Sequence, residues 1–461
     1  MLRWLVLVFS MWAHAAMGQA NLVQLQERAE EVLRQGDAET AVSLTATIIA
    51  QDPNFSPAHF VQAVALNIQG NHERAAEAAM RAYRTAQSDR QRMQAAILVS
   101  EARFAAGQYS RAELWLRRAA NNAKTEDDIR TIQQNFDSIR RANPLTVWLN
   151  FGLTPSNNVN NGISGDELVF RDQSGDIVCF PFIGCSQELG AQARILSGIE
   201  YFGSADLQYR LSESAQYLTT FDARLFVRTY TLSSESRDLI EELGGGLDGG
   251  DFSLGILEAG ITHRMRPPGG NGTVTISAHT GKLWSGWEPY WYYDRFAVGR
   301  TFQIDDRKEF EVNASVEFRD PIDASQLPTR IDTITASHTW IRPNNDQARF
   351  SIQNQDFVAG NNVLSFEDHS LALDYRFAEE ILGTQLSINT RLGQRHYDVF
   401  TTTLNGRLDH YATLGISTIF SRVSYFGFSP SMSIAATRRL SDLPEYTTTT
   451  WDGGFGIQSN F

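Results

Sequence analysis

The 461-residue chain has two cysteines and no long hydrophobic run after Trp12. A membrane-spanning helix needs about 18 or more consecutive apolar residues, so any later segment that crosses a membrane must be a β-strand. The sequence also lacks an HExxH pair and a nucleophile elbow, and no catalytic set stands out. We therefore expect no enzyme, no cofactor and no metal site. The alternative is a barrel hydrolase that assembles Ser, His and acidic residues from separate strands, for which the scattered candidates are His279, His338, His369, His396 and His410.

Residues 1–20 have the pattern of a secretory signal peptide. Arg3 precedes an apolar run, and small residues that permit cleavage follow the run, namely Ala13, Ala15, Ala16 and Gly18. No cysteine lies near this region, which argues against a lipid-anchored N-terminus. We expect an exported mature chain.

Charge is distributed unevenly. The net charge is −13, but residues 21–143 hold 15 basic and 15 acidic side chains, whereas residues 144–461 hold 24 basic and 38 acidic ones. A net acidic C-terminal half argues against nucleic-acid binding and is typical of the solvated exterior of a bacterial surface protein.

The two cysteines, Cys179 and Cys185, lie together in the segment CFPFIGC. In an exported chain this spacing predicts a local disulfide. The alternative, a metal site, would need further ligands close by, and none is present in this segment.

The N-terminal half repeats itself. Gly36 with Ala41, Gly70 with Ala75, and Gly107 with Ala112 recur at spacings of 34 and 37 residues. A period near 34, with a glycine between two helices and small residues where the helices cross, is the tetratricopeptide pattern. We predict three repeats in residues 21–143, with residues 125–142 as the C-terminal cap. Two orientations stay open for the polar residues, which face either the concave groove of the stack or solvent. They are Asn67, Gln69, Arg81, Tyr83 and Arg84.

The C-terminal half alternates apolar and polar residues from Leu145 to the last residue. Asn143-Pro144 ends the helical region, and the first strand, 145–153, has apolar residues on one face. The final strand, 449–461, also has one apolar face, with Trp451, Phe455, Ile457 and Phe461 at outward positions. Such a strand predicts an antiparallel transmembrane β-barrel over residues 144–461; the alternative is a β-sandwich.

Fourteen strands fit the pattern best. A turn at Gly203-Ser204 would give an odd number, which bacterial single-chain barrels avoid. The apolar residues on both sides of that point share one parity, however, so a single long strand is expected there; sixteen strands stay an alternative. The predicted long connections are 154–189, 231–251, 320–329, 358–366, 396–407 and 438–448. The second contains EELGGGLDGGD and is expected to be a flexible loop; the alternative is a Gly-Asp calcium repeat.

Charged residues alternate with the apolar ones on several strands and are the candidate lumen. They are Asp222, Arg224, Arg228, Glu311, Glu317, Arg319, Asp374 and Arg376. With fourteen strands both barrel ends lie on the side of the short turns, the periplasm, so the helical domain is expected there and the long connections outside.

The segment TPSNNVNNG, Thr154–Gly162, follows an alternating strand that contains Trp148. There the sequence resembles the barrel start of the surface lipoprotein assembly modulator family, in which an Asp/Asn-rich motif follows the first strand; the matching residues are Pro155, Asn157, Asn158, Val159, Asn160 and Asn161. The last strand is similar to the C-terminal assembly signal of outer-membrane barrels, with Ser459 as a departure. The looser second and third repeats and the cysteine loop depart from the family and leave the client class open.

The resemblance implies a Gram-negative outer-membrane translocon that moves a lipoprotein or small secreted protein to the cell surface. Its periplasmic repeats would receive the client. The implied partners are outer-membrane lipid, the barrel assembly machinery and the exported protein client, with no nucleic acid, and the chain is expected to be a monomer. The alternatives are an exopolysaccharide export pore, for which three repeats are few, and a nutrient porin whose repeats form a periplasmic scaffold.

Overall fold

The computed structural model describes residues 21–172, 175–323, 326–400, 406–423 and 428–459. The predicted signal peptide and Phe461 lie outside the described residues. The chain divides into two compact units, the first ending at Pro144 and the second beginning at Leu145. The boundary follows from the local sequence, since α7 ends at Ala142 and Pro144 supplies no amide to continue the helix.

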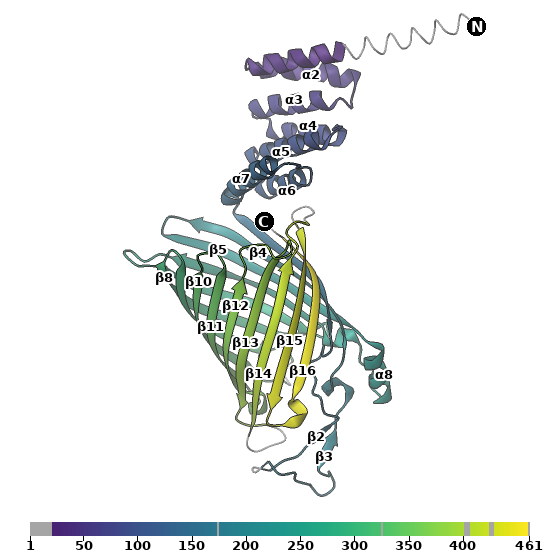
Figure 1. Ribbon diagram of the computed structural model, residues 1–461, viewed down its shortest axis with the longest axis vertical. Helices are drawn as coiled ribbons and strands as arrows, with labels where there is room; N and C mark the ends of the chain where they lie inside the picture. The colour runs from purple at the N-terminus through teal and green to yellow at the C-terminus, as the bar shows by residue number, and fades with distance from the viewer. Residues whose placement is uncertain (1–20, 173–174, 324–325, 401–405, 424–427, 460–461) are drawn as a thin grey trace, which may run out of the picture. The chain divides into compact units, whose positions relative to one another are not determined.

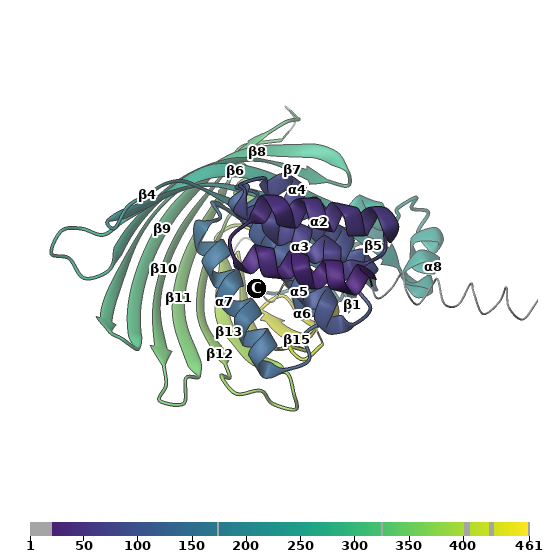
Figure 2. The same ribbon diagram turned by 90° about the horizontal axis from the view of Figure 1, so that it is seen from above.

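The first unit is a stack of helix pairs joined by short turns (Figure 1), and Figure 2 shows its helices from above. Its helices are residues 21–34, α2 (Ala38–Gln51), α3 (Ser56–Ile68), α4 (His72–Thr85), α5 (Asp89–Ala105), α6 (Tyr109–Ala120) and α7 (Glu126–Ala142). The segment predicted as the C-terminal cap forms α7, which begins with a capping box in which Thr125 and Asp128 exchange hydrogen bonds.

One turn geometry recurs in all three pairs. The turn glycines have positive φ angles, +89° at Gly36, +78° at Gly70 and +73° at Gly107. Each glycine amide donates to the carbonyl three residues earlier, and the next amide donates to the carbonyl five residues earlier. This is a Schellman motif, which needs a left-handed residue at the glycine position. The repeated glycine in the sequence therefore reports a repeated backbone conformation.

Alanine lets the paired helices approach closely. Ala41, Ala75 and Ala112, each five residues after a turn glycine, have no exposed surface. The spacing lengthens from 34 to 37 residues because α5 has 17 residues where α3 has 13. These features establish the tetratricopeptide-like fold from the helices themselves.

The second unit is a closed antiparallel barrel of fourteen strands, as predicted. Its strands are β1 (Leu145–Ser156), β4 (Gly198–Glu213), β5 (Tyr217–Leu232), β6 (Leu254–Met265), β7 (Thr273–Ser285), β8 (Glu288–Asp305), β9 (Lys308–Pro321), β10 (Thr329–Ile341), β11 (Gln347–Ala359), β12 (Phe366–Arg376), β13 (Gln385–Tyr397), β14 (Arg407–Ile419), β15 (Phe428–Ser441) and β16 (Thr448–Ser459). Consecutive strands are neighbours throughout, and β1 closes the barrel by pairing with both β4 and β16. The single long strand expected across Gly203-Ser204 is confirmed as β4.

The outer face of the barrel is apolar. Side chains at alternate positions of neighbouring strands are about half exposed, among them Leu225, Ile352, Leu371 and Phe455. A closed sheet satisfies its own backbone hydrogen bonds, and an exposed apolar girdle suits hydrocarbon, so this is an outer-membrane-type barrel. Within the described part of the chain, no helix is long and apolar enough to cross a membrane.

Long connections leave one rim of the barrel, and the barrel's two ends lie at the other (Figure 1). The first connection, 157–197, carries a small ribbon of β2 (Glu167–Val169) and β3 (Ser186–Glu188), and the helical turn η1 (Ala191–Ala193). Further helical turns, η2 (Gly249–Phe252), η3 (Asn362–Leu364) and η4 (Pro444–Tyr446), lie in later connections of the same rim. One connection at this rim is short, because β7 and β8 are joined by only two residues, Gly286 and Trp287.

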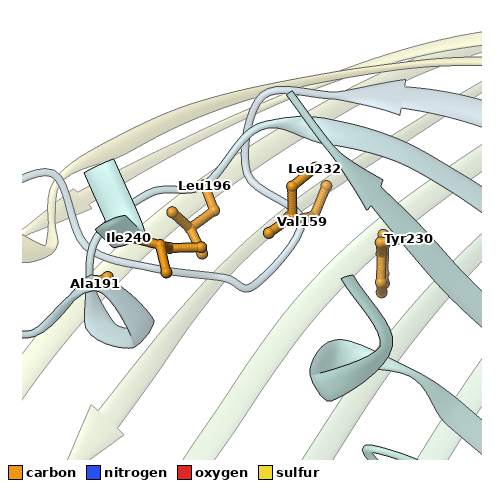
Figure 3. Packing of buried hydrophobic residues seen from close by; sticks show 6 residues of the cluster. All are labelled: Val159, Ala191, Leu196, Tyr230, Leu232 and Ile240. Carbon is orange, nitrogen blue, oxygen red and sulfur yellow. The ribbon is translucent and has the colours of Figure 1, made fainter. Parts of the chain in front are cut away.

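The expectation of a flexible loop at 231–251 is wrong, because α8 (Ser234–Glu242) forms there. Ser233 caps this helix by accepting a hydrogen bond from the amide of Ser236. Its apolar side, with Ile240, packs in a cluster shared with the first connection and β5 (Figure 3): Val159, Ala191, Leu196, Tyr230, Leu232 and Ile240. The helix forms because a neighbouring connection supplies an apolar surface, which local sequence does not reveal.

Candidate functional site

The helical unit has a hollow of about 150 Å³ on the first helices of its three pairs. Its lining residues are Gln26, Glu30, Ser56, Pro57, Phe60, Val61, Gln91, Gln94 and Ala95. Of these described lining residues, Glu30 alone carries a charge, and Phe60 supplies the only aromatic ring. The hollow therefore combines amide groups with a small apolar surface.

Gln26 is the most unusual residue of this hollow. Its side chain is only 6% exposed, and its amide nitrogen donates to Glu30 Oε1 at 2.8 Å and to the Pro57 carbonyl at 3.3 Å. A carboxylate only accepts, so the contact with Glu30 fixes the orientation of the amide. Gln26 Oε1 is buried without a hydrogen-bond partner among the described residues. An unpaired buried acceptor costs about 1–3 kcal/mol.

The polar residues for which the sequence left groove and solvent open do not line this hollow. Asn67 accepts a hydrogen bond from His72, and Tyr83 packs edge-on against Trp115 at 5.3 Å between ring centroids. Arg81, Tyr83 and Arg84 lie on α4, the second helix of its pair, whereas the hollow is built from first helices. Sequence reasoning missed Gln26 because a single glutamine looks like any surface residue; Phe60, an aromatic early in its repeat, was the usable signal.

The barrel interior carries the predicted charged residues. All eight lie at positions opposite in parity to exposed apolar side chains of their own strands, such as Phe221, Phe318 and Leu371. In a closed sheet that parity faces inward.

Ion pairs join β4 and β5 at this inner face, at 3.5 Å for Arg224–Asp206 and 3.9 Å for Arg228–Glu200. On β7, His279 Nε2 lies 3.8 Å from Asp222 Oδ2. Asp222 also accepts a hydrogen bond from Gln208 at 3.0 Å. Opposite charges thus face each other locally.

A second group of ion pairs lies farther round the wall. Glu311 pairs with Arg349 at 3.0 Å, and Glu317 with Arg319 at 2.6 Å. Glu258 accepts hydrogen bonds from Arg295 and from the hydroxyl of Tyr293. The ring of Tyr293 fills the space beside Gly281. Because these charges are paired, the electrostatic field near this part of the wall has little net sign. These residues therefore do not form a selectivity filter for ions of one sign.

The opposite part of the wall carries many small side chains. Arg376 lies at its edge and lines two hollows of about 250 and about 450 Å³, and Asp374 lines the second. The other residues of the first hollow are mostly small or amide side chains, including Asn150, Ser387, Ser417, Ser431, Ser433, Gly454 and Gly456. Sequence reasoning singled out charges and missed this wall, although the alternation of Ser431 with Ser433 and Gly454 with Gly456 is visible.

A buried ion pair lies at the rim of the long connections. Arg407 is 3.0 Å from Asp409, and both are almost fully buried. The guanidinium lies 4.1 to 4.4 Å from the ring centroids of Tyr397, Phe400 and Tyr446. This cage holds the last two long connections together.

The predicted motif begins inside β1, because this strand runs to Ser156 and not only to residue 153, and it closes the seam between β1 and β16. The Asn157 side chain donates to the Thr449 carbonyl at 3.1 Å and accepts from the Trp451 amide at 2.8 Å. Beside it, the ladder between β1 and β16 runs from Asn150 to Leu153 and resumes only at Ser156. Pro155 lies in the gap and has no amide to donate.

The rest of the motif shapes the first connection. Asn158 exchanges hydrogen bonds with the backbone of Gly162, and Asn160 bonds three backbone groups of residues 192–196. Val159 is buried in the cluster of Figure 3, and Asn161 has a φ of +53°. These are folding roles, made by side chains that hydrogen-bond main chain.

Cys179 and Cys185 form a disulfide in the first connection, with both residues exposed. The loop that it closes presents Phe182 and Ile183 to solvent. Within the described residues, no group of three or more His, Cys, Asp or Glu is arranged to hold a metal ion.

Trp451, Phe455 and Ile457 of the expected assembly signal lie on the outer face of β16, each at least half exposed. Phe461 lies outside the described residues. The outward row agrees with the period of the strand.

No family model matches the chain, and no curated protein matches it. Solved helical-repeat structures do. The Yersinia enterocolitica type III secretion chaperone SycD, in complex with a peptide of the translocator YopD, is 16% identical over 26% of this chain and 94% of its own, with a TM-score of 0.25. The Sgt2 TPR domain from Aspergillus fumigatus is 19% identical over 26% of this chain and 78% of its own, with a TM-score of 0.23.

The second TPR domain of human RPAP3, in complex with an HSP70 peptide, is 15% identical over 27% of this chain and 98% of its own, with a TM-score of 0.24. Scores and identities this low carry no argument about function. The repeat assignment rests on the glycine turns and alanine contacts, and the chain joins these repeats to an outer-membrane-type barrel, the architecture of a transporter.

Proposed function

We propose that the chain is an outer-membrane translocon that moves a lipoprotein or small secreted protein to the cell surface. The helical unit, in the periplasm, receives the client, and the barrel passes it outward. The proposal agrees with the resemblance of Pro155–Asn161 to the surface lipoprotein assembly modulator family.

The observation that carries the proposal is the hollow on the first helices of the three repeats. It offers amide groups and the Phe60 ring on a surface built from successive helices, which suits an extended polypeptide. The barrel on the same chain supports passage of such a segment, because its interior has locally paired charges and a part of the wall with many small side chains.

The test compares surface exposure of a genetically linked exported protein in three strains by protease shaving. One strain has the wild-type chain, one lacks residues 21–143 but keeps the signal peptide, and one lacks the whole gene. Heat-modifiable mobility must first show that the truncated barrel assembles. We expect exposure to fall in both mutant strains.

A matched pair of variants sharpens the test. Phe60→Ala with Gln94→Ala alters the hollow, whereas Arg81→Ala with Arg84→Ala alters α4 outside it. Exposure should fall only with the first pair. If exposure is unchanged in the truncation and in the full deletion, while glycan or small-solute flux falls in the full deletion, the translocon is wrong and an exopolysaccharide exporter or a porin replaces it.

A further inference from the structure

We infer that the hollow around Gln26 binds an internal, extended polypeptide segment through its main chain, and disfavours a segment that ends in a free carboxylate. This inference rests on the proposed function, since it specifies which part of the client the helical unit would take. It names a ligand chemistry that the resemblance does not supply.

The first step is the unpaired acceptor. Gln26 Oε1 is buried and has no partner among the described residues, while the amide nitrogen of the same side chain is held by Glu30 and Pro57. Burying an acceptor in this way is unfavourable, and a donor from a ligand would remove the cost. The backbone N–H of an extended chain is such a donor, and every residue except proline carries one.

The second step is charge. Glu30 holds the Gln26 amide and is the one charged group among the described lining residues. A ligand carboxylate would meet that carboxylate without a basic partner in the hollow, so like charges would repel. A neutral internal segment meets no such cost.

The third step is the surface beside the acceptor. Phe60 and Val61 from α3, with Ala95 from α5, give the hollow an apolar side. In an extended chain, side chains alternate from one side to the other, so a residue next to the bonded amide can place an apolar side chain there. Gln91 and Gln94 lie on the α5 side and suit further polar contacts with the main chain.

The experiment uses the full chain in detergent micelles and fluorescent 12-residue Gly/Ser peptides with one central Leu or Phe. The peptides are acetylated and amidated, and a scanning set carries one backbone N-methyl group at each position in turn. Affinity is measured by fluorescence anisotropy for wild type, Gln26→Leu and the control variant Arg81→Ala. Circular dichroism confirms equal helicity.

One N-methyl position should weaken binding to wild type and to Arg81→Ala by about tenfold, the worth of a hydrogen bond to a buried partner. The same peptide should lose little further affinity for Gln26→Leu, because the acceptor is already gone. A peptide that ends in a free carboxylate at the central residue should bind wild type about tenfold more weakly than its amide, and Glu30→Gln should reduce that difference.

Absence of binding by every peptide, equal sensitivity of wild type and Gln26→Leu to N-methylation, or a preference for the carboxylate peptide would each overturn the inference. The proposed function fails separately. If the peptides bind as expected but client exposure survives removal of residues 21–143, the main-chain site is real and the translocon is wrong. If exposure needs the helical unit but Gln26→Leu shows no coupling, the translocon stands without this site.

Discussion

Replacing Asn157 with alanine should loosen the barrel along the whole seam between β1 and β16. The Asn157 side chain makes two hydrogen bonds with the backbone of β16, at 3.1 and 2.8 Å. A neutral hydrogen bond contributes about 0.5–1.5 kcal/mol, so losing both costs about 1–3 kcal/mol. The seam has little reserve, because its ladder stops at Leu153 and resumes at Ser156, whereas the ladder of β1 with β4 runs unbroken from Leu145 to Ser156.

The assay is hydrogen exchange of β16 amides in the detergent-solubilised barrel, followed by mass spectrometry. A cost of about 1–3 kcal/mol predicts about 5- to 150-fold faster exchange at Phe455 and Ile457 if these amides exchange through opening of the seam. Asn160→Ala is the matched control, since it removes hydrogen bonds within the first connection and none to β16. Faster exchange at Trp451 alone, with Phe455 and Ile457 unchanged, would refute the reasoning, because Asn157 would then act only on its direct partner.

Four further outcomes are expected. Phe455→Arg puts a charge on the outer face, which costs about 2–4 kcal/mol near the bilayer midplane. The amount of heat-modifiable barrel in outer-membrane fractions should therefore fall, while the inward variant Gln458→Arg should assemble normally. Equal assembly of the two variants would contradict the assignment of Phe455 to the outer face of β16. Asp409→Leu leaves Arg407 buried without its ion-pair partner, so urea unfolding should show a free energy of unfolding lower by about 3–5 kcal/mol. A decrease under about 1 kcal/mol would show that the aromatic rings alone stabilise the buried guanidinium. Gly70→Ala should cost about 1–2 kcal/mol in the helical unit because of its left-handed φ, with Gln69→Ala as the neutral control, and equal melting of the two would argue against the turn geometry. The hydrogen bond with Thr125 holds the pKa of Asp128 below its ordinary value. The ionised Asp128 therefore stabilises the helix fully above the ordinary carboxylate pKa, and this stabilisation is lost as pH falls through the lowered pKa. Circular dichroism should show a loss of helicity in acid that is smaller in Asp128→Asn, and identical acid profiles of the two proteins would contradict this role of Asp128.

The architecture was predictable because its signals are periodic. Glycines that need a positive φ recur with the helix pairs, and alternation of apolar residues recurs with the strands. The parity of the apolar residues across Gly203-Ser204 decided between one strand and two, since a tight turn would reverse it. Each of these signals depends on local backbone geometry, which a single sequence carries.

The features that the sequence did not reveal depend on neighbours that are distant along the chain. Helix α8 forms where Ile240 meets Leu196 from another connection. Gln26 stands out only in the folded chain, where its amide nitrogen is held by Glu30 and by the Pro57 carbonyl from the next helix pair. The small side chains of this part of the barrel wall were not singled out from the sequence because one serine or glycine carries no strong chemical signal, although four neighbouring strands repeat them.

The Asn-rich motif ties the seam between β1 and β16 to the first long connection. Asn157 holds β16, while Asn158 and Asn160 fix the backbone of the connection that follows. Ser164 of that connection bonds the carbonyls of Glu445 and Thr447, just before β16 begins. Separating β1 from β16 at this rim would therefore also detach the connection from the last hairpin.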